Sequence, residues 1–274
     1  MSYAGRLRRI LKRPRTTQAA LRQSPRSHSI HRKEYFMALK QIPDDATIKK
    51  DGQKAFECLQ SGGVVILHYD VSYAVLCATD DALRKVYAAK NRSYDRASGV
   101  SGSYEIHRKV HVLPEEKKEM IRIIVQEYDL PLSVIAPFAP EDPFIGKLTP
   151  FLRGMATRDG TVNFLMNAGK LRDEIAKLSW EHQFPIIGSS ANASLKGTKY
   201  RVEDIEPEVL AAADLIIDYG PSKHIQTRSL SSTQIDFRDF KVVRFGICYD
   251  QIAAVLRDRF DIQLPADPYR AKAG

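Results

Sequence analysis

The chain has 274 residues, of which 43% are hydrophobic and 27% charged, a composition typical of a globular protein that buries a hydrophobic core. This composition excludes wholesale disorder and collagen-like or mucin-like chains. Ten of the 42 lysines and arginines, but none of the 33 acidic residues, lie in residues 1–33. The net charge of +9 therefore falls to a formal −1 in the rest of the chain, where 32 basic residues face 33 acidic ones. Bulk basicity is no evidence that the folded part binds nucleic acid.

Residues 1–33 are rich in arginine, serine and threonine and are interrupted by Pro14 and Pro25. Three interpretations stay open. The composition is typical of a mitochondrial presequence, and it also suits a phosphate-binding arm. The segment could also be a plain disordered tail or follow a start codon assigned too early, because Met37 begins a stretch that reads like the start of a domain. The expected compartment is the cytoplasm, or the mitochondrion if residues 1–36 are a presequence.

The cysteines Cys58, Cys77 and Cys248 lie far apart and form no CxxC pair. Neither a zinc site nor a disulfide framework is predicted, and a reducing compartment is expected. The apolar runs are much shorter than the roughly 20 residues that a membrane span requires. We therefore expect no membrane among the partners.

The first part of the folded chain combines helical periodicity with two β-rich runs. The predicted helices cover about 46–60, with Asp44 or Asp45 as N-cap, and a segment that starts at Thr79 or Asp80 and ends near Lys90. The predicted strands cover 64–69 and 73–78, on either side of a polar turn. Residues 91–105 are rich in Ser, Gly and charge and predict a long loop. Within it, 98–103 is expected to be a flexible loop or a mobile lid over phosphates.

The second half alternates in the same way. Helices are predicted over 115–127, over 169–182 and around 252–260, and short strands over 132–136, 161–166, 185–188, 215–219, 233–237 and 242–245. Hairpin-like pairs near 64–78 and 233–245 argue against a purely parallel sheet. We predict an α/β fold in which a mixed twisted β-sheet is flanked by helices. The expected parts are a basic, disordered tail over 1–43, a single domain over 44–264 and a C-terminal tail over 265–274.

Several common signatures are absent, namely GxxxxGK[ST], GxGxxG after a strand, HExxH and GxSxG. Their absence disfavours the standard nucleotide-binding folds and the serine hydrolases. The histidines His68, His107 and His111 are expected to be structural or exposed rather than metal ligands.

Five segments together carry a resemblance to a known family. They are Gly62–Val65 with Asp70, Tyr73 and Cys77; Tyr87–Arg92; Gly188–Ser194; Ser232–Asp236; and Val243–Gly246. In this order they resemble the segments GGVVxxPTDTxYGLxC, YxxKxR, STSANxS, STVxD and LRPG of the YrdC-like family. Order and spacing over residues 62–246 make the match specific, although each segment alone would be a weak signal.

The resemblance implies the YrdC-like fold, with a concave basic binding surface, and the activity of an L-threonylcarbamoyladenylate synthase. Such a nucleotidyltransferase combines threonine, bicarbonate and ATP into threonylcarbamoyl-AMP and pyrophosphate, which serves threonylcarbamoyladenosine formation in tRNA. ATP is expected as a substrate with magnesium on its phosphates. A tRNA, a double-stranded RNA and the machinery that transfers the threonylcarbamoyl group are candidate partners. No protein nucleophile is expected, because the carbamoyl-amino acid carboxylate attacks the α-phosphate itself.

The matched segments supply the candidate binding residues. Three are cations suited to a triphosphate, Lys90, Arg92 and Arg244. Three are short neutral side chains, Ser190, Asn192 and Ser232. The remaining candidates are Thr161, Asp70 and Tyr73. Each also has an ordinary structural explanation, such as a cation at a helix C-terminus or a turn-forming serine.

The chain also departs from the family pattern. Residues 68–71 read His-Tyr-Asp-Val where the family has PTDT, and Ala74 replaces a glycine. The family segment GTVGVR becomes Gly160–Leu165, so that Leu165 stands where the resemblance implies an arginine that meets the amino-acid carboxylate. Two alternatives therefore remain, a synthase that uses a different acceptor and a non-catalytic YrdC-like module that binds a nucleotide or double-stranded RNA.

Overall fold

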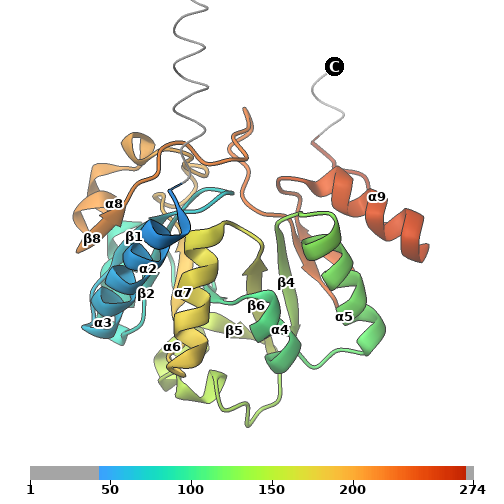
Figure 1. Cartoon of the computed structure of the whole chain (residues 1–274), viewed down its shortest axis with the longest axis horizontal. Helices are drawn as coiled ribbons and strands as arrows, with labels where there is room; N and C mark the ends of the chain where they lie inside the picture. The colour runs from blue at the N-terminus through green and yellow to red at the C-terminus, as the bar shows by residue number, and fades with distance from the viewer. Residues whose placement is uncertain (1–42, 270–274) are drawn as a thin grey trace, which may run out of the picture. The chain divides into compact units, whose positions relative to one another are not determined.

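The computed structural model describes residues 43–269 (Figure 1). The predicted tail over 1–43 lies outside the described residues except for its last residue, and so does 270–274. Within the described part, the strands form one 10-stranded sheet in the order β10-β9-β4-β6-β3-β7-β2-β1-β8, with β5 beside β6. The strands are β1 (Val65–His68), β2 (Tyr73–Cys77), β3 (Gly99–Ser101), β4 (Leu132–Pro137), β5 (Thr157–Arg158), β6 (Thr161–Met166), β7 (Ile187–Ser190), β8 (Leu215–Ile217), β9 (Gln234–Asp236) and β10 (Lys241–Arg244).

The sheet is mixed, as predicted. The pairs β1–β8, β3–β6 and β4–β9 are parallel, whereas the hairpins β1–β2 and β9–β10 are antiparallel. Neighbours in the sheet come from distant parts of the chain, since β3 lies between β6 and β7. The sheet therefore brings the predicted binding segments together across long sequence separations.

Helices flank this sheet. They are α2 (Asp45–Gln60), α3 (Asp80–Ala89), α4 (Tyr104–Val110), α5 (Glu115–Arg122), α6 (Pro150–Ala156), α7 (Lys170–Glu181), α8 (Pro207–Ala211) and α9 (Tyr249–Phe260), with a π-helical turn (Ile123–Glu127) and two 3-10 turns (Ile145–Lys147 and Val202–Asp204). Of the predicted caps, Asp44 accepts a hydrogen bond from Thr47 N at 2.7 Å and Thr79 accepts one from Ala82 N at 3.3 Å. The predicted helix over 115–127 is α5 continued by the π-helical turn.

The prediction of a flexible loop or lid over 98–103 is wrong. Residues Gly99–Ser101 form β3 in the middle of the sheet, and Ser103 caps α4 by accepting a hydrogen bond from Ile106 N at 3.2 Å. Gly102 makes this close packing possible, because a Cβ atom there would lie 2.5 Å from the ring of Phe164 on β6. The serines and glycines of this segment serve tight packing rather than mobility.

The strand β6 separates two different environments. The side chains of Val162, Phe164 and Met166 are buried in the hydrophobic core on one face of the sheet. Because side chains alternate along a strand, Thr161, Asn163 and Leu165 point to the opposite face. On that opposite face α2 and α7, which lie side by side in Figure 1, form a second core cluster against β1 and β2.

Two buried histidines complete the core behind β6. His111 Nε2 lies 3.2 Å from the carbonyl oxygen of Val162, which can only accept, so the neutral ring accepts at Nδ1 from His107 Nδ1 at 2.8 Å. Burial lowers the pKa of His107 to about 3 and holds the pKa of His111 well below its ordinary value. Both residues are therefore neutral structural groups. No helix within residues 43–269 is both long and apolar enough to cross a membrane.

Candidate functional site

Five of the predicted binding residues line one pocket, with a cavity volume of about 260 Å³. They are Arg92, Thr161, Ser190, Ser232 and Arg244. The pocket lies on the face of the sheet to which Asn163 and Leu165 also point. The fold thus gathers side chains from four of the five segments that carry the family resemblance, together with Thr161 from β6.

The lining of this pocket is strongly basic and rich in hydroxyl groups. Its charged side chains are all arginines, and among the described residues that line it none is acidic; the arginines are Arg92, Arg158, Arg172 and Arg244. The serines in the lining are Ser72, Ser98, Ser101, Ser133, Ser189, Ser190, Ser231 and Ser232. Several guanidinium groups with neighbouring hydroxyl donors suit an anion that carries more than one charge, such as a polyphosphate.

Arg244 is held in place by its neighbour across the hairpin. Its Nε donates to the carbonyl oxygen of Ser232 at 2.8 Å and its Nη2 to Ser232 Oγ at 2.9 Å, while Ser232 Oγ lies 2.8 Å from Ser133 Oγ. The register of β9 and β10 shifts between Val242 and Arg244, and such a bulge re-aims the side chain that follows it. Crowding by protein atoms lowers the pKa of Arg244 to about 10, but the residue remains exposed to solvent and charged at neutral pH.

Arg92 enters the pocket from the loop after α3. Its Nη2 donates to the carbonyl oxygen of Ala97 at 2.7 Å, and its guanidinium lies 5.4 Å from the ring centre of Tyr87. Its Nε is buried and has no hydrogen-bond partner. An unpaired, desolvated cationic donor in the wall of a pocket favours an anionic ligand.

Lys90 lies behind the pocket wall rather than in it. Its side chain is 1% exposed, and its Nζ donates to Ser189 Oγ at 2.8 Å and to the carbonyl oxygen of Ser190. Burial, followed by the positive charge of Arg92, lowers the pKa of Lys90 to about 7. Lys90 therefore acts on the pocket through the two serines at the end of β7.

Asn192, Asp70 and Tyr73 do not line the pocket. Asn192 is buried and its Nδ2 donates to the carbonyl oxygen of the next residue at 2.7 Å. The Tyr73 hydroxyl lies in the opposite core, where it donates to Gly220 O at 2.7 Å and to the Asp218 carboxylate, and burial raises its pKa. Asp70 lies in the turn between β1 and β2, where its backbone N–H donates to Ala168 O at 2.7 Å. The contacts of these three residues serve the fold.

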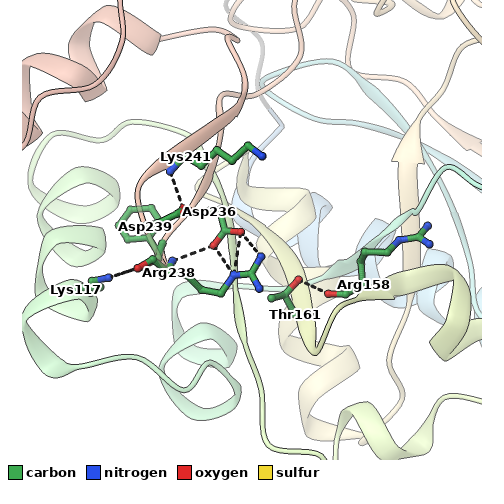
Figure 2. Close-up of polar contacts among 8 residues, drawn as sticks. Lys117, Arg158, Thr161, Asp236, Arg238, Asp239 and Lys241 are labelled. Carbon is green, nitrogen blue, oxygen red and sulfur yellow. Dashed lines mark hydrogen bonds and ion pairs between the residues drawn. The ribbon is translucent and has the colours of Figure 1, made fainter.

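Other pocket residues were not predicted from the sequence. Arg158 donates to Asp95 O at 2.9 Å, and its own carbonyl oxygen accepts a hydrogen bond from Thr161 Oγ1 at 2.6 Å (Figure 2). Beside them in Figure 2, Arg238 is paired with Asp236 at 2.7 Å and does not line the pocket.

Arg172 on α7, together with Tyr69 and Asn163, was also missed. The sequence does contain a signal for Arg172, because this charged residue shares the buried stripe of α7 with Ile175, Ala176 and Ser179. A charged residue on the apolar side of an amphipathic helix is unusual and marks either a buried ion pair or a binding site.

The lining does not fit a magnesium ion held by the protein. Magnesium prefers oxygen ligands, above all carboxylates and phosphates. The pocket-lining residues include no carboxylate, and no group of three or more His, Cys, Asp or Glu residues in the described part could hold a metal. A magnesium ion would therefore enter with the phosphates of a nucleotide, as part of the substrate.

Solved structures of other proteins share this fold. A hypothetical protein of Streptococcus mutans UA159 has 24% identity and a TM-score of 0.65, with 77% of this chain and 92% of that chain covered. The structure of P. abyssi Sua5 in complex with L-threonine has 20% identity and a TM-score of 0.57, with 79% of this chain and 59% of that chain covered. E. coli YciO has 15% identity and a TM-score of 0.53, with 73% and 90% covered. These likenesses show the fold.

A search of the curated proteins finds no match to the chain. The model of the Sua5/YciO/YrdC family, described as "Telomere recombination", matches residues 57–246, a range that includes every residue lining the pocket. The chain therefore belongs to the Sua5/YciO/YrdC family.

Proposed function

We propose that the protein is an ATP-dependent L-threonylcarbamoyladenylate synthase that serves the modification of tRNA. The observation that carries this proposal is the convergence of Arg92, Ser190, Ser232 and Arg244 on one basic pocket. The family membership and the L-threonine bound to P. abyssi Sua5 support the same function.

In the proposed reaction the amine of threonine and bicarbonate combine with loss of water to give N-carboxy-threonine. An oxygen of its carbamate group, rather than of its α-carboxylate, attacks the α-phosphorus of ATP. A new oxygen–phosphorus bond forms, the bond between the α-phosphorus and the bridging oxygen breaks, and pyrophosphate leaves with the electron pair. Arg92 and Arg244 bind the triphosphate and stabilise the charge that develops on the leaving group. Ser190 and Ser232 orient the phosphates, and Lys90 holds Ser189 and Ser190 in position. The contribution of the protein is positioning and electrostatic stabilisation.

The test is the release of pyrophosphate from ATP in the presence of bicarbonate and magnesium, with L-threonine compared against the other amino acids. We expect pyrophosphate release that depends on threonine and is lost in Arg244→Ala. The matched control is Arg257→Ala, which removes an exposed arginine on α9 that is paired with Asp258. Pyrophosphate release with another amino acid would identify a different acceptor. Measurable ATP binding without release in any mixture would instead favour a nucleotide-binding module.

A further inference from the structure

Arg172 is a buried cation in the wall of the pocket. Its side chain is 1% exposed, in the first turn of α7, and it is one of the residues that line the pocket. One nitrogen, Nη1, donates to Asp173 Oδ1 at 2.9 Å. The other terminal nitrogen, Nη2, is buried and has no hydrogen-bond partner.

This arrangement is costly for the unliganded fold. An arginine side chain stays protonated inside proteins, so the unpartnered Nη2 cannot escape the cost of desolvation by losing its charge. A buried donor without a partner is destabilising, and more so when it is charged. A ligand that places an anionic oxygen at Nη2 would supply the missing hydrogen bond.

We infer that Arg172 is a specificity residue that binds the free α-carboxylate of the amino-acid substrate. The inference rests on the proposed function for the statement that the second substrate is an amino acid. Arg172 lies on α7, outside all of the segments from which the sequence predicted the binding site.

The surroundings favour a single carboxylate over a polyphosphate at this position. Arg172 is already ion-paired with Asp173 through Nη1, and Nη2 is the buried terminal nitrogen left for the ligand. The nearby phenol of Tyr69 is a neutral donor, because burial raises its pKa to about 12 although the charge of Arg172 opposes the rise. Arg92, Arg158 and Arg244 remain available for phosphates in the same pocket.

The experiment compares the binding of free amino acids with that of their amides. Isothermal titration calorimetry would measure the dissociation constants of L-threonine and L-threoninamide, with and without a non-hydrolysable ATP analogue, and the other standard amino acids would follow in the same acid–amide pairs. The proteins are the wild type, Arg172→Gln, Arg172→Lys and the surface control Arg257→Ala. Thermal unfolding reports whether each variant keeps its fold.

The expected result is that the wild type binds at least one free amino acid at least tenfold more tightly than its amide. Arg172→Gln should lose this preference while it keeps its affinity for the ATP analogue, and Arg172→Lys should retain part of it. The acid–amide comparison in the wild type needs no variant, so it tests the inference even if Arg172→Gln does not fold.

Three results would overturn the inference. They are equal affinity for acid and amide in the wild type, no binding of any amino acid under either condition, and an Arg172→Gln variant that weakens only the ATP analogue. The proposed function fails separately, if carboxylate binding through Arg172 is found but ATP gives no pyrophosphate with any amino acid.

Discussion

The two faces of the sheet at β6 differ in which buried polar atoms lack hydrogen-bond partners. On the core face, His107 pairs with His111, which in turn bonds to Val162 O, and within this pair the one ring nitrogen without a partner is the unprotonated His107 Nε2. On the pocket face, two buried guanidinium nitrogens lack partners, Arg92 Nε and Arg172 Nη2. Burying a neutral acceptor without a hydrogen-bond partner destabilises a fold much less than burying a charged donor without one. We therefore expect a ligand to bind on the face that leaves cationic donors unsatisfied.

The largest expected effect comes from the double substitution of Arg92→Ala and Arg244→Ala. Both guanidinium groups would contact the same triphosphate, so removing both should weaken ATP binding more than either single substitution does. We expect the affinity for ATP to fall by at least about 100-fold, or about 2.8 kcal/mol, measured by calorimetry. Each single variant should lose about tenfold. An unchanged dissociation constant for ATP would show that the triphosphate does not bind in this pocket.

Gly102→Ala tests the core face. The added methyl group would meet the ring of Phe164 at 2.5 Å, and such overpacking typically costs about 1–3 kcal/mol. Urea unfolding should show this loss of stability. Gly154→Ala is the matched control, because nothing lies within 4 Å of a Cβ atom there and alanine favours the helix α6. If Gly102→Ala were as stable as the wild type, the segment around β3 would not be packed tightly against Phe164.

Lys90 is a buried cation behind the pocket wall, and its titration should have a smaller, pH-dependent effect on stability. Its pKa is lowered to about 7 in the folded protein, so between that pH and its ordinary titration range the unfolded state binds more protons. Burying the charged amine of Lys90 therefore lowers the free energy of unfolding most below pH 7, and this destabilisation decreases as the pH rises. Between pH 7 and 8 the free energy of unfolding should increase by about 1 kcal/mol more in the wild type than in Lys90→Met. Parallel curves for the two proteins would show that Lys90 is not desolvated.

Local signals in the sequence predicted most of the elements well. Helical periodicity and capping residues placed α2 and α3 within one or two residues, and alternation placed β6 at its observed bounds. The failure at β3 has a physical cause, because a three-residue strand of Gly, Val and Ser is stabilised by its neighbours β6 and β7 rather than by its own propensity.

The pocket was predictable only in part. The matched segments identified Arg92, Ser190, Ser232 and Arg244, but a motif does not say which side chain faces the ligand. Lys90 and Asn192 occupy motif positions but do not line the pocket. Lys90 is buried against Ser189 and Ser190 at the end of β7, and Asn192 is buried with its Nδ2 bonded to Ala193 O. Arg172 belongs to no motif and reaches the pocket through the packing of α7 against the sheet, which a one-dimensional pattern does not contain.

A crystal structure of the protein with a non-hydrolysable ATP analogue and L-threonine tests most directly whether one pocket binds both substrates. We expect the phosphates to lie against Arg92 and Arg244 and the amino-acid carboxylate to lie at Arg172 Nη2, within one pocket. Nucleotide density outside this pocket, with both arginines free of phosphate, would contradict it.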